Sequence, residues 1–372
     1  MAGLNETPSG DRVRISFFGR RNAGKSTLVN AITGQEIAIV SDVPGTTTDP
    51  VSKAMEILPL GPCLLTDTAG LDDEGPLGEE RVRRSLEVLA KTDIAVWVGE
   101  PEADFQSACG RMGVPVIVYR RGDDVESLKR QIAAVKLADE PPPLLKDLVK
   151  PGDTVACVCP IDESAPKGRL ILPQQQVVRE LLDVGCSALV CQPSQLAAHF
   201  ACNVPIALVV TDSQAFAAVS QVVPRRVPLT SFSILFARQN GDLAAYCAGV
   251  EAVAALKDGD RVLVAEGCTH HRQCNDIGAT KIPKALAKLS GGKLFEFTFC
   301  SGASFPLDSQ KFALVVHCGG CMLTRRVMQG RIAACRAAGV PVVNYGILLA
   351  AANGIRVESG SCLALRDLSL YP

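Results

Sequence analysis

The chain has 372 residues, of which 47% are hydrophobic and 21% charged, so it can bury the cores of two or three domains. Its formal net charge of −1 disfavours bulk electrostatic binding to nucleic acid or to an anionic membrane. No apolar run reaches the roughly 20 residues that span a bilayer, and the polar N-terminus lacks a signal-peptide core. The 15 cysteines form no regular framework. We therefore expect a cytoplasmic protein that binds neither nucleic acid nor a membrane.

The first motif follows a strand predicted for residues 13–18. Residues 19–26 read G-R-R-N-A-G-K-S, which matches the phosphate-binding pattern G-x-x-x-x-G-K-[ST] between a strand and a helix. Backbone N–H groups of such a loop, and the N-terminus of the helix after it, turn toward phosphates. The lysine can reach the β- and γ-phosphates, and the serine hydroxyl can bind Mg²⁺. The candidate nucleotide-binding residues here are Gly19, Asn22, Gly24, Lys25, Ser26 and Thr27.

Two further motifs support a nucleotide site. Residues 63–66 predict a short strand that ends in D-T-A-G, where Asp67 can hold Mg²⁺ through water and Gly70 can offer its N–H to a γ-phosphate. Between this strand and the phosphate-binding loop, residues 44–49 read P-G-T-T-T-D. One of these threonines, with Thr47 as the candidate, can close over Mg²⁺ in the triphosphate state as an order–disorder switch.

Together, G-x-x-N-x-G-K-S, P-G-T-T-x-D and D-T-A-G resemble the TrmE/Era-type small GTPases. The resemblance implies GTP and GDP as ligands, Mg²⁺, and hydrolysis stimulated by K⁺. Asn22 would help to hold the K⁺ ion, whose charge replaces an arginine finger. The candidate catalytic residues are then Lys25, Asn22 and Thr47.

The chain departs from this pattern at the guanine-reading element, which in such GTPases is N-K-x-D after a later strand. Here the strand predicted for residues 114–119 is followed by R-R-G-D. Asp123 can still accept hydrogen bonds from guanine, but the Asn and Lys positions are both arginine. Only one helix fits before the prolines at 141–143. Either residues 120–123 are a degenerate base-reading motif, or a final strand–helix unit is missing and residues 119–121 form the last base-contacting loop.

Composition divides the chain into three domains. Residues 138–143 are polar and proline-rich, as in a linker, which places the first domain at 1–140. Residues 150–245 alternate short apolar runs with helical patterns and show no catalytic pair, so we expect an α/β domain for subunit association. Residues 246–372 show a similar alternation, which predicts a parallel sheet. The strands predicted in the middle domain include residues 187–190, 206–210 and 233–236.

Two predicted strands of the last domain end beside metal-ligating residue types. Residues 262–265 precede C-T-H-H, and residues 312–316 precede H-C-G-G-C. Because ligands gather at the carboxyl ends of parallel strands, these segments can meet in space. Three thiolates and one histidine suit either Zn²⁺ or an iron–sulfur cluster, and the chemistry does not separate the two. The candidate ligands are Cys268, Cys318 and Cys321, with His270 or His317.

The GTPase motifs, a middle α/β domain and C-x-H … H-C-x-x-C together resemble the HydF family of iron-only (FeFe) hydrogenase maturation GTPases. The resemblance implies a P-loop GTPase doubly wound sheet followed by two smaller α/β domains with mainly parallel sheets, and a homodimer formed by the middle domain. It implies a 4Fe–4S cluster on Cys268, Cys318 and Cys321. The fourth position is open to His270, to His317 or to an exchangeable group. The implied partners are two radical-SAM maturases, which help to make a di-iron precursor, and the apo FeFe-hydrogenase that receives it.

Two other functions fit the motifs. A zinc-stabilised regulatory GTPase in RNA modification or ribosome assembly is disfavoured by the near-zero net charge and by the lack of a basic aromatic face. A thiol redox protein using Cys318 and Cys321 is the other alternative, and no electropositive neighbourhood visibly activates either thiol.

Overall fold

The computed structural model divides into two compact units, Met1–Glu140 and Pro141–Pro372, which are described separately. Within the described residues, no helix is long and apolar enough to cross a membrane. The described residues are 12–34, 51–68, 85, 87–136, 142–161, 170–267, 277–302, 305–306, 311–320, 322–357 and 362–365.

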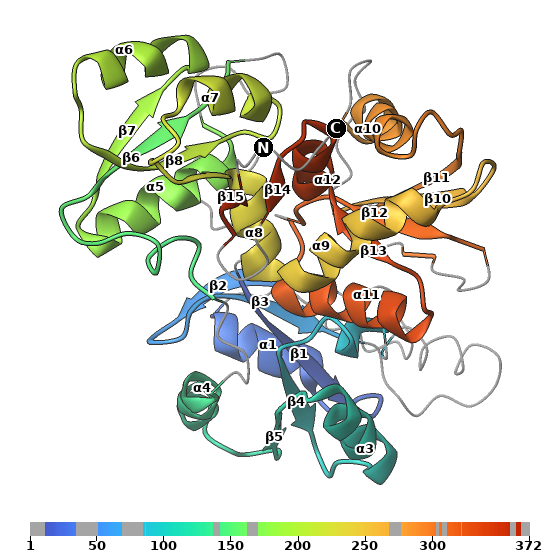
Figure 1. Ribbon diagram of the computed structural model, residues 1–372. Coiled ribbons are helices and arrows are strands. Elements are labelled where there is room, and N and C mark those ends of the chain that lie inside the picture. The colour runs from blue at the N-terminus through green and yellow to red at the C-terminus, as the bar shows by residue number, and fades with distance from the viewer. Residues whose placement is uncertain are drawn as a thin grey trace. The chain divides into compact units, whose positions relative to one another are not determined.

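The first unit is built on a five-stranded sheet in the order β2-β3-β1-β4-β5 (Figure 1). The central strand β1 pairs parallel with β3 and β4, and β5 pairs parallel with β4. The edge strand β2 is antiparallel to β3, and the sequence did not reveal it, because it lacks a continuous apolar run. The strands are β1 (Val13–Gly19), β2 (Val51–Ile57), β3 (Gly61–Asp67), β4 (Ile94–Val98) and β5 (Val116–Tyr119).

Helices cover both faces of this sheet. On one face α1 and α4 bury Leu28 and Ile132 in the same cluster as β1 side chains. On the other face α3 places the Phe105 ring 4.5 Å from the Trp97 ring, measured between centroids. The doubly wound sheet predicted from the sequence is therefore confirmed. The helices are α1 (Lys25–Thr33), α3 (Ala103–Met112) and α4 (Val125–Ala134).

The second unit begins with a parallel four-stranded sheet in the order β7-β6-β8-β9. The strands predicted at 187–190 and 206–210 are confirmed as β7 and β8. The strand predicted at 233–236 is wrong, because these residues lie in helix α8. This helix is buried on most of its sides, so its apolar run lacks a helical period and resembles a buried strand. The elements are β6 (Thr154–Val158), α5 (Leu172–Val184), β7 (Ser187–Cys191), α6 (Leu196–Ala201), β8 (Ile206–Thr211), α7 (Phe216–Val222), β9 (Leu229–Ser231) and α8 (Phe232–Asn240).

The same unit contains a further parallel sheet in the order β11-β10-β12-β13. Two smaller α/β regions with parallel sheets therefore follow the first unit, as the sequence predicts. The elements are α9 (Leu243–Ala252), β10 (Arg261–Glu266), a π-helical turn (Ile277–Lys281), α10 (Ile282–Leu289), β11 (Glu296–Ser301), β12 (Leu314–His317), α11 (Arg325–Ala337), β13 (Val342–Asn344) and α12 (Tyr345–Ala352), with the antiparallel pair β14 (Arg356–Val357) and β15 (Ala364–Leu365).

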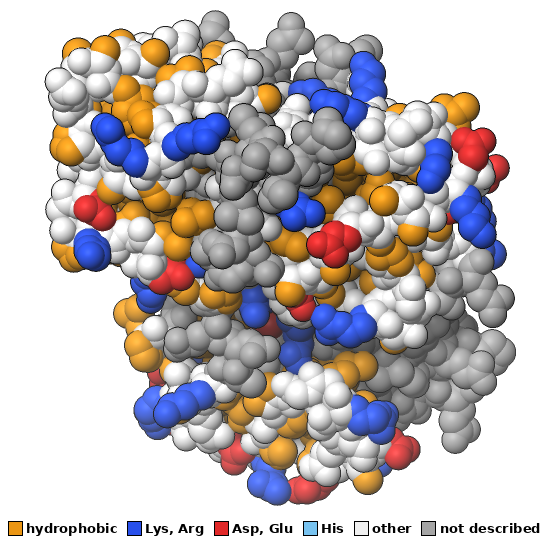
Figure 2. Space-filling model, in the orientation of Figure 1, with side chains coloured by type: hydrophobic (Ala, Val, Ile, Leu, Met, Phe, Trp, Pro, Cys, Tyr) orange, Lys and Arg blue, Asp and Glu red, His pale blue; other side chains and the backbone are white. Residues whose placement is uncertain are grey.

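One hydrophobic core joins the elements of these two sheets. Val155 of β6, Phe232 of α8 and Val315 of β12 belong to the same buried cluster. Helix α8 contacts α5 on one side and α11 and α12 on the other. Residues on both sides of position 245 thus fold together. On the described part of the face drawn in Figure 2, basic and acidic side chains are interspersed with hydrophobic ones.

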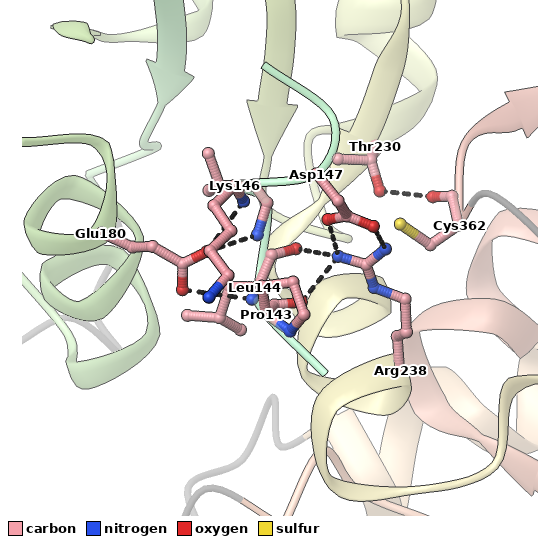
Figure 3. Close-up of polar contacts among 9 residues, drawn as sticks. Pro143, Leu144, Lys146, Asp147, Glu180, Thr230, Arg238 and Cys362 are labelled. Carbon is pink, nitrogen blue, oxygen red and sulfur yellow. Dashed lines mark hydrogen bonds and ion pairs between the residues drawn. The ribbon is translucent and has the colours of Figure 1, made fainter. Parts of the chain in front are cut away.

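The first segment of the second unit, residues 143–147, is fastened by Arg238 of α8 (Figure 3). The Nη2 atom of Arg238 donates to the carbonyl oxygens of Pro143 and Leu144 at 2.6 and 2.7 Å. Its two Nη atoms also donate to the Asp147 carboxylate at 2.8 and 2.9 Å. Because the Arg238 side chain is only 11% exposed, water screens these charge-assisted bonds less than it screens a surface ion pair.

Glu180 of α5 holds the same segment from the other side (Figure 3). Its carboxylate accepts hydrogen bonds from the backbone N–H groups of Leu144, Leu145 and Lys146 at 3.1, 2.8 and 2.9 Å. A carboxylate suits this place because all three of these groups are donors. The start of the second unit is thereby joined to two helices of its core.

We expect Glu180→Gln to lower the free energy of unfolding of the second unit by about 1–3 kcal/mol, because the amide turns a donor toward backbone donors. Urea unfolding curves measure the change. The matched control is Asp183→Asn on the same helix, which removes an exposed pair with Arg179 and should cost less than about 0.5 kcal/mol. Equal losses in the two variants would contradict the role given to Glu180.

Candidate functional site

Strand β1 leads directly into the phosphate-binding loop. Its last residue, Gly19, has φ +149°, and a Cβ there would lie 2.6 Å from the Val98 carbonyl oxygen on β4. Only glycine allows this close approach of the two strands. Gly24 has φ +93° and precedes α1, with no side-chain cap on the helix. The first N–H groups of α1 therefore form an uncapped helix N-terminus, which favours an anion.

Lys25 places its ammonium group inside this loop. The residue is 7% exposed, and its Nζ donates to the carbonyl oxygens of Gly19 and Arg20 at 3.1 and 2.8 Å. A buried ammonium favours the approach of a phosphate, because the phosphate supplies the opposite charge. The loop thus combines a helix N-terminus with a fixed positive charge.

Ser26 and Asp67 form a candidate Mg²⁺ site beside the loop. The Ser26 hydroxyl donates to Asp67 Oδ2 at 2.5 Å, and Asp67 is 1% exposed. Within the described residues, Asp67 Oδ1 is buried and has no hydrogen-bond partner. Burial raises the pKa of Asp67, while the Ser26 hydrogen bond and the Lys25 charge oppose that rise. A divalent cation fits these residues, because it would bind the free oxygen and stabilise the carboxylate.

The R-R-G-D segment forms a closed turn after β5. Asp123 Oδ2 accepts from the Arg120 N–H at 2.7 Å, and the Tyr119 hydroxyl donates to the Asp123 carbonyl oxygen at 3.0 Å. The Arg120 side chain pairs with Glu100 at 2.9 Å. One carboxylate oxygen of Asp123 is therefore already used within the turn. Among the described residues 12–136, α4 follows this turn and no sixth strand joins the sheet.

The remaining candidate nucleotide residues differ in what the structure says of them. Asn22 has a left-handed backbone with φ +58°, and its side chain is exposed. Thr27 is exposed on α1. Thr47 and Gly70 lie outside the described residues.

The candidate cluster site lies at the carboxyl end of β10 and β12. These strands are parallel neighbours, with Ala265 opposite His317. The Cys318 N–H donates to the Ala265 carbonyl oxygen at 2.9 Å, so Cys318 stands beside the end of β10, from which the chain continues to Cys268. The register therefore brings Cys318 to the described end of β10, whereas the C-T-H-H segment lies outside the described residues.

Backbone donors surround the Cys318 sulfur. Its Sγ accepts from the N–H groups of Gly267 and Gly320 at 3.0 and 3.4 Å. Hydrogen bonds of this kind favour an anionic sulfur, as metal ligation requires. Gly320 has φ +66°, and a Cβ there would lie 2.6 Å from the Met328 sulfur. Glycine is therefore required at this position of C-G-G-C.

His317 is buried against α11 and is 2% exposed. Its Nε2 lies 2.8 Å from Arg331 Nη1, and its Nδ1 lies 2.8 Å from the Cys318 carbonyl oxygen. A guanidinium only donates, so Nε2 accepts and Nδ1 carries the proton. The pKa of His317 is lowered to about 4, chiefly by burial and also by the Arg331 charge, while the hydrogen bond to the Cys318 backbone opposes this shift. His317 is thus a neutral imidazole with both nitrogens in use.

Sequence reasoning missed Arg331, which is 6% exposed on α11. Besides His317, it donates to the Gly302 carbonyl oxygen at 2.6 Å and lies 4.9 Å from the centroid of the Phe305 ring. A signal was present in the sequence. Arg331 occupies the apolar stripe of a helix, at the spacing i, i+3, i+4, i+7, with the other buried residues Met328, Ile332 and Cys335.

The other predicted ligands, Cys268, Cys321 and His270, lie outside the described residues. Within the part of the chain that the structure describes, no three His, Cys, Asp or Glu side chains group as a metal site. Of the two described candidates, Cys318 has the surroundings of a ligand, whereas His317 is engaged with Arg331.

We expect Asp67→Asn to slow Mg²⁺-dependent hydrolysis of a nucleoside triphosphate by at least about 100-fold, because the neutral amide removes the charge beside the metal. Phosphate release at saturating nucleotide measures the rate. Lys129→Ala on α4 is the control, since Lys129 pairs with the exposed residue Glu126 on the surface of the same helix. Near-wild-type hydrolysis by Asp67→Asn would overturn the assignment of this aspartate.

Three protein-family models match the chain. A 50S ribosome-binding GTPase model matches residues 14–133. The hydrogen maturase F dimerization domain matches residues 144–241, and the hydrogen maturase F tetramerization domain matches residues 244–359. The first match lies in the first compact unit, and the other two divide the second unit between its two sheets.

Two curated relatives each match about a third of this chain. A tRNA modification GTPase MnmE from Methylobacterium sp. (strain 4-46) is 41% identical over 120 residues, which are 31% of this chain and 27% of that protein. A GTPase Der from Wolinella succinogenes is 38% identical over 134 residues, or 33% of this chain and 28% of that protein. The chain therefore spans under a third of the length of these relatives.

Some solved structures of GTP-binding proteins resemble parts of this chain. NFeoB from S. thermophilus bound to GDP·AlF4⁻ and K⁺ is 17% identical, with a TM-score of 0.23, and the match covers 34% of this chain and 65% of that one. An Era variant from Aquifex aeolicus bound to GDP·AlF4⁻ is 14% identical, with a TM-score of 0.26, and the match covers 78% and 92% of the two chains. These scores are low, so the fold assignment rests on the sheet order and the family models.

Because two models specific to hydrogen maturase F account for the second unit beside a GTPase domain, the chain belongs to the hydrogen maturase F (HydF) family.

Proposed function

We propose that the chain is a GTP-hydrolysing scaffold and carrier in assembly of the active-site cluster of FeFe-hydrogenase. It binds a 4Fe–4S cluster through Cys268, Cys318 and Cys321, receives a di-iron precursor with the help of radical-SAM maturases, and delivers it to the apo-hydrogenase. Residues 1–140 form the GTPase domain, 150–245 a dimerisation domain and 246–372 the cluster domain. The matches to two hydrogen maturase F domains support this division of labour.

The pairing of β12 with β10 is the observation that carries the proposal. It places Cys318 beside the strand end that leads to Cys268, although the two cysteines are 50 positions apart. Ligands are expected to gather at such strand ends in a parallel sheet. It occurs in a chain whose first unit carries a phosphate-binding loop, which is the combination that distinguishes this family from other GTPases.

The described residues fit an iron–sulfur ligand set. Cys318 is only partly buried and its sulfur has backbone donors, whereas the core thiols Cys157 and Cys335 are fully buried. A bound 4Fe–4S cluster supplies an iron with an exchangeable fourth position, where a di-iron unit can attach. The chain's own contribution is to hold three thiolates at one sheet edge and leave that position to His270, to His317 or to an exchangeable group.

On the nucleotide side, Lys25 binds the β- and γ-phosphates, and Ser26 and Asp67 hold Mg²⁺. Asn22 helps to hold K⁺, and Thr47 closes over the metal in the triphosphate state. Hydrolysis then controls exchange of partners, not chemistry on the cluster. The burial of the Lys25 ammonium in the loop supports its role, and so does Asp67 Oδ1, which has no hydrogen-bond partner within the described residues.

A zinc-stabilised GTPase acting on RNA gains no support from the second unit. The similarity to tRNA modification GTPases covers 31% of the chain in the first relative named above. The described surface in Figure 2 mixes basic with acidic and hydrophobic side chains, and the net charge is −1. Neither observation favours an RNA-binding surface.

We expect the protein, purified without oxygen and reconstituted with iron and sulfide, to show the optical and EPR spectra of a 4Fe–4S cluster. Cys318→Ala should lose most of the bound iron, because only two thiolates remain. Cys202→Ala is the matched control, since Cys202 is exposed at the end of α6, in the region of the β7-β6-β8-β9 sheet. A colourless wild-type protein that contains stoichiometric zinc would contradict the proposed 4Fe–4S cluster.

We expect hydrolysis of GTP to be at least about 10-fold faster in K⁺ than in Na⁺, since the cation neutralises charge in the transition state. GTP and ATP turnover in both salts measures this and the base preference. Arg120→Asn combined with Arg121→Lys restores the N-K-x-D pattern. This double variant should raise the ratio of GTP to ATP turnover about 10-fold, because it adds one hydrogen bond to guanine. Equal rates for both nucleotides in wild type and variant would show that residues 120–123 do not read guanine.

A further inference from the structure

Among the described residues, no carboxylate matches the buried positive charge of Arg331. It lies on the inner stripe of α11 and is 6% exposed. Among the residues that the structure describes, the charged or ionisable groups that act on its guanidinium are three cysteines and no Asp or Glu. A buried guanidinium without a counter-ion is strongly unfavourable, so its position calls for an anion that the described side chains do not provide.

The polar partners of Arg331 orient its guanidinium but do not neutralise it. Nη1 donates to His317 Nε2 at 2.8 Å, Nη2 donates to the Gly302 carbonyl oxygen at 2.6 Å, and the Phe305 ring lies 4.9 Å from the guanidinium carbon. The imidazole, the carbonyl and the ring are all uncharged. Together they fix the plane of the guanidinium on the side of the sheet where β12 ends.

The three cysteines near Arg331 differ in their surroundings. Cys300 and Cys335 are buried core thiols at 7% and 0% exposure. Cys318 is partly exposed, and its sulfur already accepts two backbone N–H bonds. Of the three, Cys318 alone belongs to the candidate ligand set, so a thiolate-bound centre at Cys318 supplies the missing negative charge.

We propose that Arg331 is a positioning residue that provides the buried counter-charge of the cluster, and that His317 is the acceptor that holds Arg331 in place and not the fourth cluster ligand. The inference rests on the proposed cluster-binding function and assigns two residues within it. A fixed cation beside the ligands stabilises the more negative, reduced state of a cluster. A histidine with both ring nitrogens engaged has no lone pair to give to iron.

The test compares variants that separate charge from hydrogen bonding. Arg331→Gln keeps a donor for His317 and removes the charge, whereas Arg331→Lys keeps the charge. Arg336→Gln on the same helix is the control, because the Arg336 side chain is 68% exposed and pairs with Asp242. Each variant is reconstituted without oxygen, its iron and sulfide are measured, and the cluster is titrated to its midpoint potential by EPR.

For Arg331→Gln we expect the ratio of reduced to oxidised cluster, measured at the wild-type midpoint potential, to fall about 10-fold, which corresponds to about 59 mV for one electron. Arg331→Lys should stay close to wild type, and Arg336→Gln should not differ from it. An unchanged midpoint in Arg331→Gln, or equal shifts in the Gln and Lys variants, overturns the counter-charge role. If Arg331→Gln does not fold, Arg331→Lys is the deciding variant. A 10-fold change in its ratio of reduced to oxidised cluster would contradict the counter-charge role, because lysine keeps the positive charge.

His317→Gln tests the second half of the proposal, because the Gln carbonyl can accept from Arg331. We expect full iron content and an unchanged EPR spectrum, including the nitrogen couplings seen by pulsed EPR. Loss of a strong nitrogen coupling in this variant would identify His317 as a ligand and overturn the assignment. A wild-type protein that forms no cluster removes the proposed function and this inference together. A wild-type cluster whose potential ignores Arg331 removes the inference alone.

Discussion

The candidate cluster site depends on the parallel pairing of β10 with β12. The register that sets Ala265 opposite His317 also lets the Cys318 N–H bond to the Ala265 carbonyl oxygen. A shift of one residue would turn Cys318 to the other face of the sheet and remove it from its backbone donors. Hydrophobic burial of both strands fixes this register, since the side chains of β12 are buried throughout. The chemistry of the sulfur therefore depends on the packing of the strand beneath it.

Each of the two candidate sites contains a buried charged or chargeable group. In the first unit Lys25 donates to the carbonyl oxygens of Gly19 and Arg20, and within the described residues Asp67 Oδ1 has no hydrogen-bond partner. In the second unit the hydrogen bonds of Arg331 to described residues reach neutral groups, the His317 imidazole and the Gly302 carbonyl oxygen. Such groups reduce the stability of the ligand-free protein and favour ligands of opposite charge. Each site is thus arranged for its ligand by the same balance of burial and charge.

Much of the fold followed from the sequence, and the exceptions have physical causes. The phosphate-binding loop and the alternation of apolar runs with helical patterns predicted the doubly wound sheet and the two parallel sheets after it. The strand predicted at 233–236 is helix α8, because a helix buried on most sides has no polar face to mark its period. Strand β2 escaped notice because an antiparallel edge strand carries no continuous apolar run. The R-R-G-D turn after β5 was located by its pattern, but the use of the Asp123 carboxylate within that turn was visible only in three dimensions.

By itself the sequence determined the features that lie within a few residues of one another: the loop from Gly19 to Ser26, the pairing of Cys318 with Cys321 in one motif, and the order of the domains. The tertiary structure decided what contacts these features. The Ser26 hydroxyl hydrogen-bonds to Asp67, 41 positions away, and the His317 imidazole hydrogen-bonds to Arg331 on the next helix. The reason is that backbone pattern is encoded locally, by period and by turn chemistry. The partner of a buried polar group is set by which elements pack together, and that depends on the whole core.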